Sequence, residues 1–261
     1  MLKVRVIPTL LWKGPGLVKG IGFDSWRRIG TVMPAIKVYN ARDVDELILL
    51  DISATGENRI PDLDAINELA SECFVPLTVG GGVHDINTVR NLLRAGADMV
   101  AINTAAYEYP DFIRAASNLF GAQCVVASID AKRHSDGHYE CFSHSGNVAT
   151  GRDVVQHAKW LEEQGAGEIL ITSVERDGTM QGYDLDLIRA VARNVRIPVI
   201  ASGGAGQFSD FVAAIKEADA SAVAAASMFH FTERTPSEAK AFMADNGIAV
   251  RHSVPGVLRG S

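Results

Sequence analysis

Short apolar runs alternate with amphipathic patterns along almost the whole chain, and this alternation most constrains the fold. The runs contain few polar residues, as is typical of parallel strands covered on both faces. Between them, apolar residues recur at spacings of three and four, which predicts helices packed on a sheet, most clearly at 85–95, 153–164 and 185–194. The predicted strands are 4–10, 47–52, 76–79, 99–102, 123–129, 169–173, 199–201 and 222–225.

Eight such units in a chain of 261 residues predict an α/β fold of the (β/α)8 TIM-barrel class. The alternative is an open, doubly wound sheet with helices on both faces. We expect one barrel domain over residues 1–252. The Gly-containing, aperiodic segment 253–261 is expected to be a flexible C-terminal tail.

The two halves of the chain resemble each other, at offsets of 119 to 123 residues. The matching segments are 46–51 with 168–173, 76–82 with 198–204, 99–104 with 222–227, and the end of the first strand with 129–132. In the last pair, Leu11 is the mate of Asp130. We therefore expect two half-barrels related by a pseudo-twofold axis, and a site with two equivalent ends.

Glycine turns follow the third and seventh predicted strands, at 80–82 and 202–206. Glycine lets backbone N–H groups approach an anion closely, and phosphate sites after the last two strands are common in this fold. A hydroxyl follows the fourth and the eighth strand, at Thr104 and Ser227. The repeat therefore predicts two phosphate sites and a ligand with a phosphate at each end. The alternative is that these segments are only tight turns.

Carboxylates stand at or beyond the ends of three predicted strands: Asp51, Asp130 and Asp177. In a barrel these ends face the active-site mouth, where a carboxylate can move protons. We expect Asp130 to be catalytic and Asp51 to contact the ligand. For Asp177, ligand binding and turn formation both stay open, because an aspartate before Gly178 also favours a turn.

Composition excludes several other classes of function. The net charge of −6 gives no support to a nucleic-acid surface. Three scattered cysteines, without CxxC spacing, argue against a zinc site or disulfides. We therefore expect no metal and no cofactor. Without a membrane span or a signal peptide, we expect a cytoplasmic protein that binds no membrane.

Over roughly residues 1–252 the motifs resemble the cyclase subunit of imidazole glycerol phosphate synthase. They are TVGGGVHD at 78–85, INTAA at 102–106, IDAKR at 129–133, ERDGT at 175–179, SGGAG at 202–206 and FHF at 229–231. The resemblance implies a glutaminase subunit docked at the barrel bottom, whose ammonia passes through the barrel. It also implies that Asp130 is the catalytic acid and that Lys19 is the lysine of a mobile loop. It assigns one phosphate site to Gly82, Asn103 and Thr104, and the other to Asp177, Gly178, Gly204, Ala226 and Ser227.

The resemblance also gives a role to charged residues at the starts of strands. On spacing alone, Arg5, Glu46 and Glu168 are expected to be exposed residues at the barrel bottom. By resemblance they become three members of a charged gate to the ammonia passage. Asp98 and Gln123 match the surface that meets the glutaminase.

Two residues depart from the family pattern. Leu11 stands where the family has a catalytic aspartate, and Met99 stands where the gate has a lysine. Leucine cannot exchange a proton, which puts cyclase activity in doubt. The opening segments 5–11 and 16–19 look more like a paralogous group associated with amidation of sugars for bacterial O-antigen and related surface glycans. That group is thought to work with a glutaminase and a third, amidotransferase-like protein.

These observations favour an ammonia-delivering synthase subunit that serves glycan amidation. The alternative is a true histidine-pathway cyclase–lyase in which Asp130 carries the acid–base work; Lys19-Gly20 and Ser202-Gly203 are closer to that enzyme. Two further hypotheses are a non-enzymatic barrel that switches on its glutaminase, and the related sugar isomerase of the same fold. The isomerase is less favoured because its chemistry needs both strand-end carboxylates.

Overall fold

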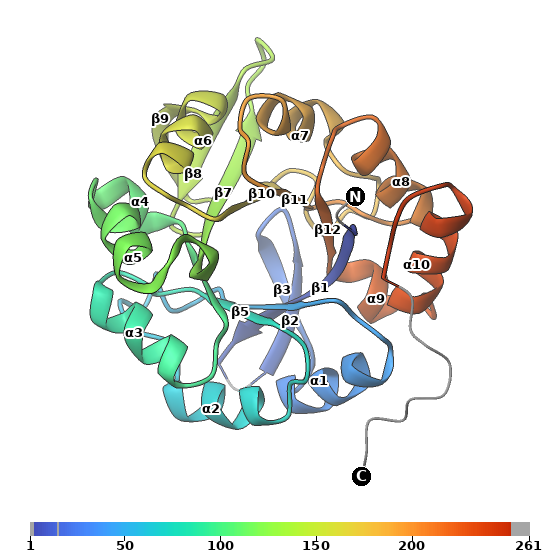
Figure 1. The fold of residues 1–261 in the computed structure, drawn as a ribbon, viewed down its shortest axis with the longest axis horizontal. Coiled ribbons are helices and arrows are strands. Elements are labelled where there is room, and N and C mark those ends of the chain that lie inside the picture. Colours follow the sequence, from blue (N-terminus) through green and yellow to red (C-terminus); the bar gives the residue numbers. More distant parts are fainter. Residues whose placement is uncertain (1–2, 15, 252–261) are drawn as a thin grey trace.

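A closed barrel of eight parallel strands forms the centre of the molecule, which excludes the open doubly wound sheet (Figure 1). The computed structural model describes residues 3–14 and 16–251, so the tail predicted at 253–261 lies outside the described residues. Each strand pairs with the next, and β12 pairs with β1 to close the ring. The strands are β1 (Arg5–Lys13), β4 (Leu47–Asp51), β5 (Leu77–Gly80), β6 (Met99–Ile102), β7 (Val125–Arg133), β10 (Glu168–Ser173), β11 (Val199–Ser202) and β12 (Ala222–Ala225).

Helices surround the barrel, and the three clearest predictions among them are confirmed (Figure 1). In α3, α6 and α7, an aspartate before the helix accepts a hydrogen bond from a backbone N–H of the first turn. None of the helices in the described part of the chain is long and apolar enough to cross a membrane. The helices are α1 (Val32–Ala41), α2 (Leu63–Ser71), α3 (Ile86–Arg94), α4 (Thr104–Glu108), α5 (Phe112–Phe120), α6 (Val154–Glu163), α7 (Leu185–Ala192), α8 (Phe208–Lys216), α9 (Ser227–Phe231) and α10 (Pro236–Asp245), with a 3-10 turn, η1 (Ala122–Cys124).

Branched aliphatic side chains fill the middle of the barrel. Every second residue of a strand points inward, so each strand contributes one side chain to each layer. The buried cluster inside the barrel contains Ile7, Ile48, Val126, Leu170 and Ile200. This apolar layer separates the charged strand starts at the bottom from the polar strand ends at the top.

Two antiparallel hairpins extend the sheet beyond the barrel, and the sequence did not predict them. β2 (Gly16–Ile21) pairs with β1 and with β3 (Asp24–Gly30). β8 (Tyr139–Ser143) pairs with β7 and with β9 (Val148–Asp153). These partners lengthen β1 and β7 past their predicted ends. One hairpin follows the first strand of each half, so the pseudo-twofold repeat extends to the insertions.

A buried ion cluster attaches the last helix to the start of the barrel. Lys240 in α10 is 2% exposed, and its Nζ lies 2.9 Å from Asp43 Oδ2 and 3.1 Å from Asp45 Oδ1. The other oxygen of Asp45 accepts a hydrogen bond of 2.9 Å from the backbone N–H of Val6. Removal of the lysine would leave a buried carboxylate without its cation.

We therefore expect Lys240→Ala to lower the free energy of unfolding by about 3–5 kcal/mol, because a buried charge is costly without its partner. Chemical denaturation of the purified chain measures this. Lys159→Ala, an exposed position in α6, is the matched control and is expected to change it by less than about 0.5 kcal/mol. Equal effects of the two substitutions would contradict the role of the cluster.

Candidate active site

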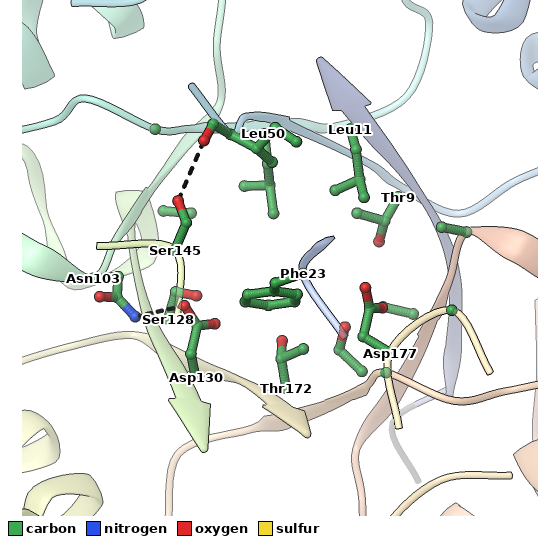
Figure 2. Close-up of a pocket in the computed structure, with 18 of the residues that line it drawn as sticks. Thr9, Leu11, Phe23, Leu50, Asn103, Ser128, Asp130, Ser145, Thr172 and Asp177 are labelled. Carbon is green, nitrogen blue, oxygen red and sulfur yellow. Dashed lines mark hydrogen bonds between the residues drawn. The ribbon is translucent and has the colours of Figure 1, made fainter. Parts of the chain in front are cut away.

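A pocket opens at the carboxyl ends of the barrel strands and encloses about 1130 Å³, including open space at its mouth. Both glycine turns and the strand-end carboxylates line it. In a barrel the βα turns and the strand ends converge on one face, so residues far apart in sequence meet there. Figure 2 shows these side chains pointing into a common space.

Asp130 lines this pocket near the end of the barrel part of β7, one level above Ser128. It is 8% exposed, and its Oδ2 accepts a hydrogen bond of 3.2 Å from the side-chain amide of Asn103. Burial, reinforced by the negative charge of Asp177, raises the pKa of Asp130 to about 7. A carboxyl that titrates near neutrality can act as a general acid or base.

Asp177 follows β10 and shares a wall of the pocket with Asp130 (Figure 2). Burial raises its pKa to about 6, although the charge of Lys19 and a hydrogen bond from the Gly178 backbone act in the opposite direction. Burial also lowers the pKa of Lys19, which the attraction of Asp177 opposes. The structure therefore brings Lys19, from the β2–β3 hairpin, near Asp177. The backbone N–H of Gly22 donates to the Asp177 carbonyl at 2.9 Å and holds the hairpin there.

The opposite wall of the pocket is apolar. Leu11 pairs in register with Leu50 of β4, and both side chains line the pocket (Figure 2). The site therefore has hydrocarbon where a carboxylate at position 11 would face Asp130. This confirms that Leu11 lies in the site, as the repeat predicted.

Several lining residues escaped the sequence analysis, among them Thr9, Ser128, Thr172 and Phe23. The first three point into the pocket, as their positions on the strands allow (Figure 2). Thr9 stands two residues before Leu11, and Ser128 two residues before Asp130, so the strand period of two could have found them. Phe23, at the tip of the β2–β3 hairpin, carries no such signal, and its ring lies across the centre of the pocket in Figure 2.

The residues predicted for the two phosphate sites all line the same pocket. Gly204 has a φ of +111°, and a side chain there would collide with the carbonyl of Gly182, so this turn requires glycine. The same holds for Gly82, where a side chain would collide with the carbonyl of Arg59. The lining residues from the predicted phosphate sites are Gly82, Asn103, Thr104, Asp177, Gly178, Gly204, Ala226 and Ser227.

Asp51 also lines the pocket, but its carboxylate is occupied by protein groups. Arg59 donates to Oδ2 at 2.6 Å and to Oδ1 at 3.1 Å. The backbone N–H groups of Ser53 and Ala54 also donate to Oδ1, each at 3.1 Å. Asp51 therefore organises the loop after β4, which is a structural role that the sequence analysis did not foresee.

The charged residues at the strand starts meet at the barrel bottom, on the far side of the apolar layer. Arg5 donates to Glu46 and to Glu168, each at 2.7 Å, and Thr78 donates to Glu46 at 2.9 Å. Burial raises the pKa of Glu46 to about 7, against the effect of Arg5. The spacing-based expectation of exposed residues is therefore wrong: Glu46 is buried, and Arg5 and Glu168 are partly buried, because they pair with one another at the barrel bottom.

The buried Oε2 of Glu168 has no hydrogen-bond partner among the described residues. Met99, from β6, packs against the cluster inside the barrel. Asp98 and Gln123 precede β6 and β7, and Asp98 accepts a hydrogen bond of 2.8 Å from the Leu77 backbone. Both lie at the strand starts, away from the pocket.

In the part of the chain that the structure describes, no three histidine, cysteine or acidic side chains are placed to hold a metal ion. Asp130, Asp177 and the glycine turns line the pocket, and Lys19 lies near Asp177. The sequence model of the histidine biosynthesis protein family matches residues 5–235 of the chain, which include all of these groups.

The raised pKa values make the stability of the fold depend on pH. Asp130 titrates near 3.8 in the unfolded chain and at about 7 in the folded one, so its protonated form stabilises the fold below pH 4. This stability is lost as the pH rises towards 7. We expect Asp130→Asn to raise the melting temperature at pH 8 and to have little effect at pH 4. Each kcal/mol gained in the free energy of unfolding raises the melting temperature by about 2–4 °C.

Thermal unfolding of the wild type and the variant at both pH values measures this difference. Asp111→Asn is the control, because Asp111 is exposed and its side chain makes no capping bond with α5. It is expected to change the melting temperature equally at the two pH values. If Asp130→Asn raised the melting temperature no more at pH 8 than at pH 4, the raised pKa of Asp130 would be contradicted.

Proposed function

The chain belongs to the histidine biosynthesis protein family, and on that premise we propose that it is the ammonia-using subunit of a glutamine amidotransferase complex. Family membership supports an enzymatic role in general. Within the family, we propose a paralogue that serves amidation of surface-glycan sugars. The observation that carries this choice is Leu11, which faces the pocket as the repeat mate of Asp130.

In this proposal a glutaminase docks at the barrel bottom, around Asp98 and Gln123, and releases ammonia beside Arg5, Glu46 and Glu168. The apolar layer above this cluster favours neutral ammonia over ammonium, because a bare cation is costly to desolvate. Met99 packs against the apolar layer and carries no charge, so the entrance beside Arg5 lacks the cation that a lysine at position 99 would supply. Ammonia then reaches the pocket at the floor formed by Thr9 and Ser128.

At the top, the pocket holds a phosphorylated ligand by its glycine turns, and Asp130 exchanges protons with the reacting group. Lys19 closes over the ligand from the hairpin. A third, amidotransferase-like protein takes part in the transfer to the final sugar. Support for this arrangement comes from the convergence of Asp130, Asp177 and the turns on one pocket, with Lys19 near Asp177.

A second candidate is the histidine-pathway cyclase–lyase, which forms imidazole glycerol phosphate, and Asp177 specifically favours it. Asp177 and Asp130 share one wall, and the charge of Asp177 raises the pKa of Asp130. Two carboxyls with pKa values of about 6 and 7 can divide the roles of acid and base between them. In this reading Asp177 replaces the carboxylate missing at position 11.

A direct assay separates the two candidates. The purified chain, given the histidine-pathway intermediate and ammonium chloride, is expected to show no cyclase turnover. Leu11→Asp restores a second positioned carboxyl and is expected to show measurable turnover, because a general acid or base usually contributes about 10²–10⁴-fold to the rate. Leu50→Asp, on the same wall but off the repeat position, is the matched control and is expected to gain nothing.

Robust turnover by the unaltered chain would overturn the amidation proposal in favour of the cyclase. In that case Asp177→Asn is expected to lower kcat by about 10²–10⁴-fold with little change in KM. Circular dichroism of every variant distinguishes lost chemistry from lost structure.

A further inference from the structure

One lysine that the proposed function does not use connects Asp130 with a turn at the pocket mouth. This turn joins β8 to β9 over residues 144–147 and is called here the covering turn. We propose, building on the function proposed above, that Lys132 is a positioning residue of the site. Its ammonium fixes the covering turn at the pocket, and its charge favours the ionised form of Asp130, which can accept a proton.

The covering turn contacts other parts of the barrel top. Ser145 lines the pocket, and its hydroxyl donates to the carbonyl of Ile52, after β4, at 3.3 Å (Figure 2). Gly146 lies against Phe23 of the β2–β3 hairpin, since a Cβ atom on this glycine would lie 2.9 Å from the Phe23 ring. The place of the covering turn therefore bears on the place of Phe23, whose ring lies across the pocket.

The backbone of the covering turn needs support from outside the turn. His144, Ser145 and Gly146 all have positive φ values, of +52°, +55° and +75°. A side chain in this left-handed region crowds the backbone, so two consecutive residues other than glycine are costly there. Contacts with the rest of the barrel must offset this cost to keep the turn in place.

Lys132, in β7, supplies a charged contact of this kind. Its Nζ donates to the carbonyl of Gly146 at 2.7 Å, the distance of a strong, charge-assisted hydrogen bond. The same atom lies 4.2 Å from the centre of the Phe142 ring, within the range of a cation–π interaction. Phe142 pairs in register with Asp130 across β7 and β8. The ammonium therefore joins the covering turn to the two strands that carry the acid.

The charge of Lys132 also acts on Asp130. Burial and the negative charge of Asp177 raise the pKa of Asp130 to about 7, and the positive charge of Lys132 acts in the opposite direction. The two side chains lie two residues apart in β7 and so share one face of the strand. Tyr107 of α4 and Cys141 of β8 also lie near Asp130, but burial raises the pKa of both, so they stay uncharged at neutral pH.

The next residue along the strand, Arg133, offers a matched comparison. It carries the same charge and also lies over an aromatic ring, at 5.6 Å from the centre of the Tyr139 ring. Successive side chains of a strand point to opposite faces, so Arg133 points away from the face that Asp130 and Lys132 share. Its side chain is exposed. Replacement of Arg133 therefore removes a cation from the same hairpin without removing the bond to the covering turn.

Titration of the Asp130 carboxyl carbon by nuclear magnetic resonance tests the effect of the charge. Lys132→Met keeps an apolar stem without the ammonium and is expected to raise the pKa of Asp130 by about 0.5 or more, because an attractive charge is lost. Lys132→Arg restores a cation that can donate to a carbonyl and lie over a ring, and is expected to return the pKa to its original value. Arg133→Met is expected to change it by less than about 0.2, because solvent screens an exposed charge.

Hydrogen exchange of the same variants tests the hold on the covering turn. The backbone N–H of Asn147 donates to the carbonyl of Ser143 and closes the turn, at 3.1 Å. Lys132→Met is expected to speed its exchange about tenfold or more, because a hydrogen bond from a charged donor is lost. Lys132→Arg is expected to restore slow exchange, and Arg133→Met to leave it unaltered. Lys132→Gln is a second neutral variant and is expected to behave like Lys132→Met.

The proposal would be overturned if both neutral variants left the pKa of Asp130 or the exchange of Asn147 unaltered. Equal effects of Arg133→Met, or a failure of Lys132→Arg to restore both quantities, would also overturn it. Circular dichroism checks that every variant is folded. The measurements use the chain alone, without ligand, ammonia or partner, so their outcome is independent of the function proposed above.

Discussion

The alternation of inward and outward side chains within a closed ring of parallel strands governs the rest of this structure. Because all eight strands run in the same direction, each inward position belongs to one level of the barrel. Arg5, Ile7, Thr9 and Leu11 of β1 pass through four such levels, from the charged bottom to the pocket. An insertion of one residue in a strand would turn the inward side chains after it to the helix-facing side of the barrel.

This strict alternation explains why the sequence predicted so much of the molecule. The barrel strands are short apolar runs that alternate with helical patterns, and Asp130 stands near the barrel end of its strand, which faces the mouth. The glycine turns were recognisable because a side chain at Gly82 or Gly204 has no room. These features depend on local rules that a single sequence displays.

The features that were not predicted depend on contacts between distant segments. β3 is mostly exposed and shows no apolar periodicity. The hairpin tip that carries Phe23 is attached to the loop after β10 by the hydrogen bond from Gly22. Nothing in the sequence near Asp51 announces that Arg59 will bind it, or that Thr55 will accept from Gly82. Such pairings depend on loop conformations, and loops show no regular spacing of residues from which their contacts could be predicted.

The attachment of α10 has a consequence for how the barrel can be assembled. Asp45 precedes β4, the second barrel strand of the first half, but Lys240, the cation that neutralises it, lies 195 positions later in the chain. During synthesis the first half therefore emerges with a carboxylate that cannot be buried at low cost until almost the whole protein has been made. Although its sequence repeats, the molecule does not consist of two self-sufficient units, and its last helix completes a core that the first strand begins.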